Sequence, residues 1–345
     1  MTEVRSGRGA WAEPAVEEVS PGVHRVPLPL PNDGLRAVNV YVLTGEAGAV
    51  LVDAGWSIPE SRALLSSSLR RLELGESDIR RFLVTHVHRD HYTQAVAIRR
   101  DAGATVALGE GERASMDSIV DPAHQPSAAM LGTLRLMGAG AVADRLTAYL
   151  ATAERPSARD WELPDEWLRP GPLTTEVGRT LDVVETPGHT RGHVVFHDLA
   201  AGLLFAGDHV LPTITPSIGF EPVLSPNPLG DFLHSLAVVR ARPDAVLLPA
   251  HGPVAPSVHA RVDELVDHHG HRLEETERAV ERGATTGLEV AGELRWTRRE
   301  HKLEDLDLFN TTLAISETGA HLALLVAQDR LRASDIDGVR HYVID

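Results

Sequence analysis

The feature that most constrains this chain is the run THVHRDH at residues 85–91, which places three imidazoles and one carboxylate within six positions. The preceding stretch, IRRFLV, is apolar and predicts a strand, and the following stretch predicts a helix. His86 and His88 are two residues apart, so an extended backbone projects both rings to the same side. Asp90 and His91 follow where the chain turns into the helix. Packing does not account for four such side chains at a strand end, so the run predicts a metal site.

Composition narrows how a metal can be held. The 345 residues include no cysteine, which excludes disulfides, thiolate zinc sites and cysteine nucleophiles, so the ligands must be His, Asp or Glu. The formal net charge is -16, and so acidic a chain is a poor match for nucleic acid. The polar N-terminus lacks an apolar signal core, and no apolar run approaches the length of a membrane span. We therefore expect a soluble, cytoplasmic protein that does not associate with membranes.

Alternating strand and helix patterns predict an α/β fold. Strand-like runs lie at 23–30, 37–45, 49–56, 79–86, 104–109, 179–208 and 244–252, and helical spacing lies at 57–74, 91–103, 258–283 and 309–331. Between the two groups of strands, Met, Ala and Leu recur at helical spacing. We expect a flexible leader at 1–20, a catalytic domain at 21–256 with a helical insertion at 111–175, and a mainly helical C-terminal subdomain at 257–345.

Three more candidate ligands each follow a predicted strand: His189 after LDVVETPG, Asp208 after GLLFAG, and His251 after AVLLPA. Any one of them has an ordinary explanation, because polar residues often cap strands and turns. Together they recur at the carboxyl ends of strands, where α/β proteins gather their sites. Five His and two Asp supply three or four ligands to each of two ions if one Asp bridges. The inventory suits two zinc ions, with iron or manganese as alternatives.

The order HxHxDH, GHT, GD and a late His resembles the metallo-β-lactamase superfamily, and within it the glyoxalase II-like hydrolases and relatives with a helical, winged-helix-like C-terminal extension. The resemblance covers about residues 22–256 and implies a four-layer αββα sandwich. It implies that the first metal is held by His86, His88 and His189, the second by Asp90, His91 and His251, and that Asp208 bridges them.

The same resemblance assigns supporting roles. Asp53, in VLVDAG, matches an early Asp that supports the ligand loop, although a simple turn before Gly55 explains it equally well. His193, in GHTRGH, matches a companion of the ligand His that we interpret as structural. Four residues are expected to contact substrate: Tyr92, His209, Ser217 and Phe220. For Tyr92, packing on the first turn of the helix is the alternative.

The resemblance implies that a hydroxide shared by both ions attacks a carbonyl, with Asp90 orienting it and accepting its proton and Asp208 bridging the ions. A small-molecule thioester or ester is the expected substrate, while a lactone, a β-lactam amide or a phosphodiester is an alternative. No basic set for gripping glutathione is evident. A low-turnover, metal-bound binding protein is a further alternative. The helical regions can be interpreted as a substrate lid or as a homodimer surface. We interpret His268, His269 and His271 as part of an exposed helix face.

Overall fold

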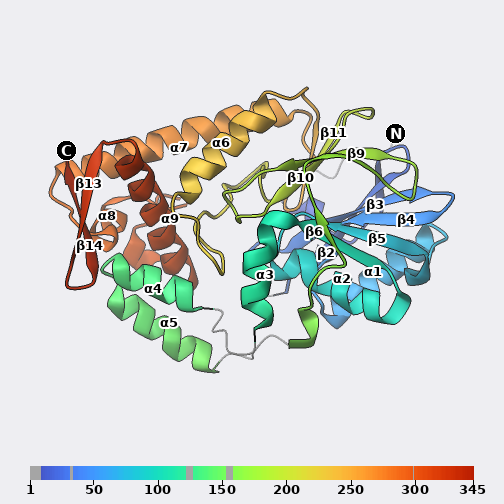
Figure 1. Ribbon diagram of the computed structural model, residues 1–345, viewed down its shortest axis with the longest axis horizontal. Coiled ribbons are helices and arrows are strands. Elements are labelled where there is room, and N and C mark those ends of the chain that lie inside the picture. Colours follow the sequence, from blue (N-terminus) through green and yellow to red (C-terminus); the bar gives the residue numbers. More distant parts are fainter. Residues whose placement is uncertain (1–8, 32–33, 122–126, 153–157, 298) are drawn as a thin grey trace.

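The computed structural model describes residues 9–31, 34–121, 127–152, 158–297 and 299–345. Two β-sheets lie face to face, and helices cover the outer face of each, so the sandwich has four layers (Figure 1). A second, mostly helical region adjoins one end of this sandwich. The predicted αββα architecture is confirmed.

The first sheet has seven strands in the order β1-β2-β3-β4-β5-β6-β7. They are β1 (Glu17–Ser20), β2 (Val23–Pro29), β3 (Ala37–Gly45), β4 (Gly48–Val52), β5 (Ile79–Val84), β6 (Thr105–Gly109) and β7 (Glu166–Leu168). The first four pair antiparallel, and β4 to β7 pair parallel. Strand β4 is buried throughout, as its unbroken apolar run requires of a strand covered on both faces.

The second sheet has five strands in the order β12-β11-β10-β9-β8. They are β8 (Gly171–Thr174), β9 (Thr180–Glu185), β10 (Val194–Asp198), β11 (Leu203–Gly207) and β12 (Val246–Pro249). Strands β8 to β11 form an antiparallel meander, whereas β12 pairs parallel with β11. Because β5, β9, β11 and β12 each end before a candidate ligand, this topology decides where those ligands meet.

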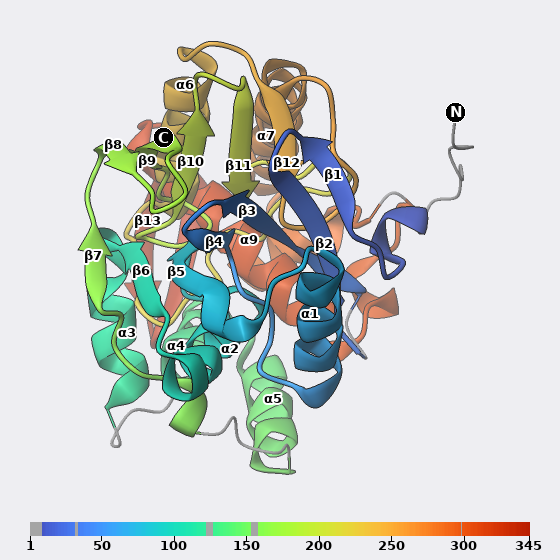
Figure 2. The same cartoon turned by 90° about the vertical axis from the view of Figure 1, so that its right-hand side faces the viewer.

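Three apolar cores hold the layers together. Side chains such as Leu83 and Phe205 fill the space between the sheets. Helices α1 (Pro59–Arg71) and α2 (Arg89–Ala102) cover the first sheet, and α6 (Pro228–Arg240) and α7 (Val258–Glu281) cover the second (Figure 2). Because the faces of both sheets are covered, functional side chains can gather only at the ends of the strands.

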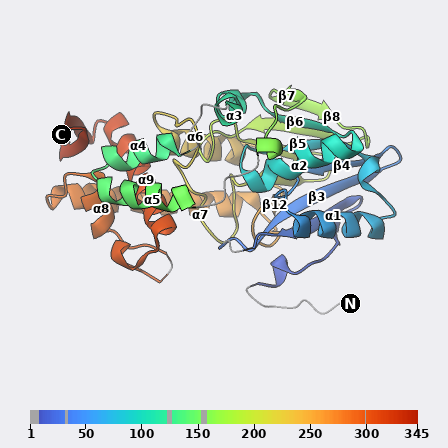
Figure 3. The same cartoon turned by 90° about the horizontal axis from the view of Figure 1, so that it is seen from below.

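The helical region gathers segments that lie far apart in the sequence (Figure 3). Its helices α4 (Ala128–Leu136), α5 (Gly140–Thr152) and α8 (Gly287–Glu293) pack around α9 (Leu308–Ala327), and α7 packs against α8 and α9, while α3 (Arg113–Val120) lies beside the sandwich. Strands β13 (Leu331–Ile336) and β14 (Val339–Ile344) form a hairpin against α7 and α9, and a bridge joins His341 to Thr286. The predicted C-terminal helical region is thus confirmed, with a hairpin at its end.

Short 3-10 turns complete the chain: η1 (Ala10–Ala12), η2 (Glu76–Asp78), η3 (Glu110–Glu112), η4 (Ala158–Asp160) and η5 (Leu303–Asp305). None of the helices in the described ranges is long and apolar enough to cross a membrane.

Three sequence predictions need correction. The leader at 1–20 is wrong for its described part, because Glu17–Ser20 pairs with β2 and the Trp11 carbonyl accepts a hydrogen bond from Arg25; residues 1–8 lie outside the described residues. The insertion at 111–175 is helical only in its first part, because its last part forms β7 at the edge of the first sheet and β8 at the edge of the second. His269 is fully buried against Phe232 and His321, so it does not share an exposed face with His268 and His271.

Candidate metal centre

All seven candidate ligands lie at one edge of the sandwich, in the loops or in the first helical turn that follow its strands. His86 follows β5 closely, and His88 is the residue before the first turn of α2, which holds Asp90 and His91. His189, Asp208 and His251 follow β9, β11 and β12. The topology therefore brings together residues that are up to 165 positions apart, as the sequence pattern predicts.

Three imidazoles form the first cluster, which consists of His86, His88 and His189. The Nδ1 atom of His88 lies 3.0 Å from Nε2 of His86 and 3.1 Å from Nε2 of His189. Nitrogens that are about 2.0–2.1 Å from a tetrahedral zinc ion lie roughly 3.3 Å from one another. The spacing of these three nitrogens is therefore close to that of a zinc-binding face.

The second cluster consists of Asp90, His91 and His251. Oδ2 of Asp90 lies 3.6 Å from Nε2 of His91 and 3.4 Å from Nε2 of His251. Asp208 lies between the two clusters and turns one oxygen to each. Its Oδ2 lies 3.5 Å from Nε2 of His189, and its Oδ1 lies 3.7 and 3.4 Å from Nε2 of His91 and His251. This is the geometry of a carboxylate that can bridge two cations.

Unpartnered atoms show what the centre can accept. Nε2 of His91, Nε2 of His251 and Oδ1 of Asp208 are all buried, and none has a hydrogen-bond partner within the described ranges. A buried polar atom without a partner is costly, yet these three face one another. A cation would satisfy all of them at once, so the residues present fit a metal ion.

The remaining ring nitrogen of each imidazole is held by a specific acceptor, which fixes the tautomer that points a lone pair inward. Three backbone carbonyls serve in this way: Phe220 O accepts from His88 Nε2 at 3.2 Å, Ser217 O from His189 Nδ1 at 2.8 Å, and Ala37 O from His251 Nδ1 at 2.8 Å. His86 donates Nδ1–H to the hydroxyl of Thr85 at 3.0 Å. The lone pairs of the first cluster therefore converge before any ligand binds.

Asp53 orients the fifth imidazole. Its Oδ2 accepts Nδ1–H of His91 at 2.9 Å, and its Oδ1 accepts the backbone N–H and the hydroxyl of Thr85 at 2.8 and 2.9 Å. Asp53 adopts φ +60°, a left-handed conformation that is uncommon for a residue other than glycine. Asp53 therefore both forms a turn and supports the ligand loop, which were the two alternatives that the sequence left open.

His193 holds Asp208 in place from behind. The backbone N–H of Asp208 donates to Nε2 of His193 at 3.1 Å, so Nδ1 of His193 carries the proton and donates to Thr186 at 2.8 Å. The ring also stacks on His86, with centroids 5.0 Å apart. His193 contacts candidate ligands from outside the centre, in keeping with the structural role expected from the sequence.

A profile of the Metallo-beta-lactamase superfamily matches residues 33–251. The chain belongs to the metallo-beta-lactamase superfamily. It is a metallo-hydrolase of that superfamily, and the profile spans every candidate ligand.

Several relatives of the superfamily extend over nearly the whole chain. A probable metallo-hydrolase of Bacillus subtilis is 24% identical over 315 residues, which cover 89% of this chain and 92% of the relative. The crystal structure of a metallo-beta-lactamase family protein from Thermus thermophilus matches with a TM-score of 0.74 and 29% identity, over 95% of this chain and 100% of that one. A beta-lactamase domain protein from Burkholderia ambifaria matches with a TM-score of 0.79 and 28% identity, over 97% of both chains. The helical region is thus shared with whole-length relatives in the superfamily.

One partial relative has a more specific name. An atrochrysone carboxyl ACP thioesterase from Paecilomyces divaricatus is 32% identical over 102 residues, which are 29% of this chain and 30% of that protein.

Electrostatics distinguish the two clusters of this superfamily member. Burial lowers the pKa of His88 to about 3, and burial together with the neighbouring imidazoles lowers the pKa of His86. Burial also acts on His91, but the carboxylates of Asp53, Asp90 and Asp208 outweigh it and raise its pKa to about 10. The first cluster is therefore neutral and ready to bind a cation, whereas the second holds protons that a cation would displace.

Two expected substrate contacts are corrected by the structure. Tyr92 is fully buried, stacks on Trp161, and donates its hydroxyl to the carbonyl of Glu162 at 2.7 Å, so it packs beside the helix instead of reaching the centre. His209 is also fully buried, with its ring against Phe232. Both residues therefore contribute to packing.

The other two expected contacts lie in the loop after β11. Ser217 and Phe220 hold His189 and His88 through backbone carbonyls, a role that side-chain patterns in the sequence do not reveal. The ring of Phe220 lies 6.2 Å from that of His88 and 5.8 Å from that of Phe309 on α9, which is 56% exposed. This aromatic pair links the first cluster to the helical region, and its contact with substrate stays a prediction.

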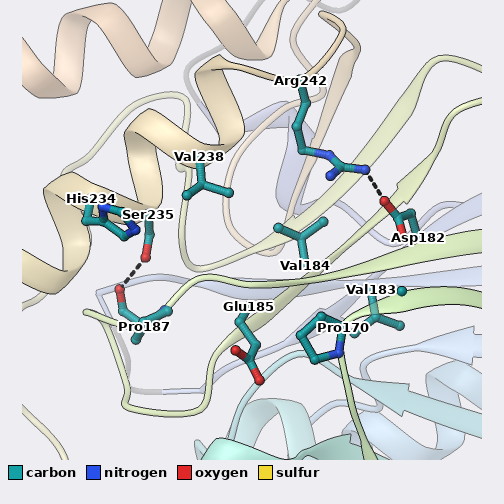
Figure 4. A pocket seen from close by; sticks show the side chains of 11 residues that line it. Pro170, Asp182, Val183, Val184, Glu185, Pro187, His234, Ser235, Val238 and Arg242 are labelled. Atoms are coloured by element: carbon teal, nitrogen blue, oxygen red, sulfur yellow. Dashed lines mark hydrogen bonds and ion pairs between the residues drawn. The ribbon is translucent and has the colours of Figure 1, made fainter.

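Helix α6 packs against the loop that carries His189, which contains the GHT motif at 188–190 (Figure 4). Ser235 donates its hydroxyl to the carbonyl of Pro187 at 2.8 Å. Next to it, Gly188 has φ +140°, and an added Cβ would lie 2.4 Å from Phe232. An outer pocket of about 640 Å³ lies beside this anchor, between α6 and β9, with the Arg242–Asp182 ion pair on its wall. The pocket therefore lies behind the loop that carries His189.

Gly207 is required where β11 meets Asp208. It has φ +50°, and an added Cβ would lie 2.7 Å from both Nε2 of His193 and Oγ1 of Thr85. We expect Gly207→Ala to lower the free energy of unfolding by about 2–4 kcal/mol, since it adds a clash to a left-handed backbone. Gly202→Ala is the control, because Gly202 has φ +64° with open space around it, and we expect a loss of only about 1 kcal/mol. Urea unfolding of both variants measures the difference, and equal losses would contradict the steric argument.

Two buried glutamates, Glu112 and Glu221, accept hydrogen bonds from the loops that carry the candidate ligands. Burial raises the pKa of Glu112 to about 7. Burial also raises the pKa of Glu221 to about 8, and the negative charge of Glu112 contributes to this rise. Between pH 4.5 and 8 the folded chain thus keeps a proton that the unfolded chain has lost. The free energy of unfolding must then fall as pH rises through this window, by up to about 1.4 kcal/mol per pH unit for one proton.

We expect Glu221→Gln to flatten this decline, because glutamine does not ionise and its oxygen can still accept the backbone N–H of Arg191, now bonded at 2.8 Å. Urea unfolding at pH 5, 6, 7 and 8 measures the slope in both proteins. The exposed Glu185 provides the control variant Glu185→Gln, whose slope should match that of the parent. Parallel slopes for Glu221→Gln and its parent would exclude this source of pH dependence.

Proposed function

We propose that this protein is a dinuclear zinc hydrolase that cleaves a thioester or ester of a small acyl compound. The observation that carries the proposal is the placement of Asp208, whose two oxygens face the two clusters separately at 3.4–3.7 Å. A structural zinc site closes four unshared protein ligands around one ion, whereas here each ion would have three unshared ligands and a share of one carboxylate, and zinc can take a fifth ligand, so water and substrate can still bind. This open arrangement is what a catalytic centre needs.

Each ion has its own set of residues. His86, His88 and His189, with Oδ2 of Asp208, would hold the first ion. Asp90, His91 and His251, with Oδ1 of Asp208, would hold the second. Imidazole-rich sets with a few carboxylates suit zinc, and iron or manganese can occupy related sets. We propose zinc because five of the seven groups are imidazoles.

The chemistry divides between the ions and the chain. Paired zinc ions, when bound, generate a nucleophile from water near neutral pH and polarise the oxygen of the attacked carbonyl. Asp90 is suited to orient that nucleophile: the side chain is 14% exposed, and the facing His91 and His251 outweigh burial and lower its pKa, so it is ionised and can accept a hydrogen bond from the attacking water. The loop of Ser217 and Phe220 keeps His189 and His88 aimed inward during turnover.

The nature of the bond is supported by relatives rather than by geometry. The Paecilomyces protein and an Emericella nidulans protein, which is 22% identical over 72% of this chain, are both named atrochrysone carboxyl ACP thioesterases. A thioester is also the easier bond to break among acyl compounds, because a thiolate leaves readily. We therefore place thioesters first and oxygen esters second.

The test combines metal analysis with a substrate panel. We expect about two zinc ions per chain, and turnover of acyl thioesters and p-nitrophenyl esters above that of lactones, nitrocefin or bis-p-nitrophenyl phosphate. A protein that binds no metal would overturn the whole proposal. If two ions bind but only the phosphodiester or only nitrocefin reacts, the dinuclear centre stands and the acyl substrate is wrong.

A further inference from the structure

Glu112 is a buried glutamate to which the proposed function assigns no role. It is the last residue of η3, precedes α3, and is completely excluded from solvent. A buried carboxylate requires hydrogen-bond donors to offset its lost hydration. Its donors come from two loops that both carry candidate ligands.

A single oxygen of Glu112 connects those loops. Oε1 accepts the backbone N–H of Val87 at 3.3 Å and the hydroxyl of Thr190. Val87 separates His86 from His88, and Thr190 directly follows His189. The three imidazoles of the first cluster are therefore linked through one acceptor that touches none of them.

Backbone packing brings Glu112 to this position. An added Cβ on Gly192 would lie 1.9 Å from the backbone nitrogen of Glu112, and one on Gly109 would lie 2.3 Å from the carbonyl oxygen of Gly192. The turn at 109–112 thus rests directly on the GHTRG loop, which only glycines allow. The sequence GEGE reads as a polar surface turn, yet its second glutamate is placed under the centre.

We propose that Glu112 is a positioning residue that sets the separation of the HxH and GHT loops and so preorganises the first metal site. This inference rests on the proposed dinuclear centre. The role requires an acceptor at Oε1, whereas Oε2 has no hydrogen-bond partner among the described residues, although the Ser115 hydroxyl lies near Glu112. Glutamine keeps the acceptor, and its amide can donate to Ser115. Alanine removes the acceptor and leaves two donors unsatisfied.

The test is zinc titration of the metal-stripped, full-length protein, with stoichiometry and affinity read by calorimetry. We expect Glu112→Ala to keep one tight ion and to bind the other about 10–100-fold more weakly, the range typical for outer partners of metal ligands. Glu112→Gln should retain both ions with affinities near those of the parent. Ser115→Ala, which removes a neighbouring buried hydroxyl, is the control and should also retain both.

Each outcome separates the hypotheses. If the parent binds no zinc, the dinuclear proposal and this inference fall together. If the parent binds two ions and Glu112→Ala does too with unchanged affinities, only the role of Glu112 is wrong. Equal weakening of both ions in the alanine and glutamine variants would also overturn it. Should Glu112→Ala not fold, Thr190→Val removes one donor at similar volume, and it must weaken one ion selectively for the inference to stand.

Discussion

Asp208→Asn is expected to lower kcat/KM by more than about 100-fold and to reduce the zinc content below two ions per chain. Loss of an outer partner typically costs 10–100-fold, and Asp208 contacts both clusters directly, so its loss should exceed that range. Asparagine keeps the volume and the backbone N–H that donates to His193 at 3.1 Å. The variant therefore removes the negative charge and one oxygen ligand while the loop keeps its anchor.

The matched control is Asp198→Asn. Asp198 is also a buried aspartate in the second sheet, at the end of β10, where it accepts hydrogen bonds from Arg179 and the backbone of Ala201. Its loss should lower stability and leave kcat/KM and zinc content near those of the parent. Steady-state kinetics on the best ester, with metal analysis of the same preparations, make the comparison. Parental turnover in Asp208→Asn would rule out a bridging carboxylate.

Residue spacing predicted the seven candidate ligands because their side chains are the functional groups. The repeated pattern of an apolar strand followed by His or Asp is visible locally, and the parallel or meandering topology brings those strand ends together. The alternation of strands and helices predicted the α/β class, whereas the four-layer arrangement came from the resemblance to the superfamily. The strand and helix pattern depends on short-range periodicity, which a single sequence carries.

The roles that the sequence did not reveal depend on backbone atoms or on distant packing. The carbonyls of Ser217 and Phe220 act through atoms that every residue possesses, so side-chain identity gives no signal. The burial of Glu112 depends on Gly109, Gly111 and Gly192, at which an added Cβ would clash with the facing turn. Tyr92 was assigned to the substrate, but Trp161, some 70 positions away, provides a stacking partner that its local sequence does not predict.

We propose that helix α9 faces a small-molecule site. Helix α9 contains no Lys or Arg in its 20 residues, and it packs against α4, α5, α7 and α8 instead of lying exposed. A helix that reads nucleic acid would present cations to the phosphate backbone. Here the exposed Phe309 contacts Phe220, beside the first cluster, so we expect α9 to form a wall of the substrate site.

Removal of the metal is expected to abolish turnover and to reveal different proton chemistry in the two clusters. Zinc binds neutral imidazole, so a protonated ligand must release its proton on binding. Facing carboxylates outweigh burial and raise the pKa of His91 to about 10, and those of Asp208 and Asp90 likewise raise the pKa of His251. Burial lowers the pKa of His189 and the other imidazoles of the first cluster. At pH 7 we therefore expect proton release to accompany binding at the second cluster only.

Calorimetric titration of chelator-treated protein with zinc, in two buffers of different ionisation enthalpy, measures this release for each ion. One step should release no proton and the other one or two. Because the pKa of His91 is higher in the folded chain, its protonated ring also stabilises the metal-free fold. This contribution is fully present below about pH 6.5 and is lost as pH rises towards 10. Each ion at 100 times its Kd should add about 2.7 kcal/mol to the free energy of unfolding. Equal proton release in both steps would contradict the assignment of the clusters, and full activity after complete chelation would contradict metal-dependent hydrolysis itself.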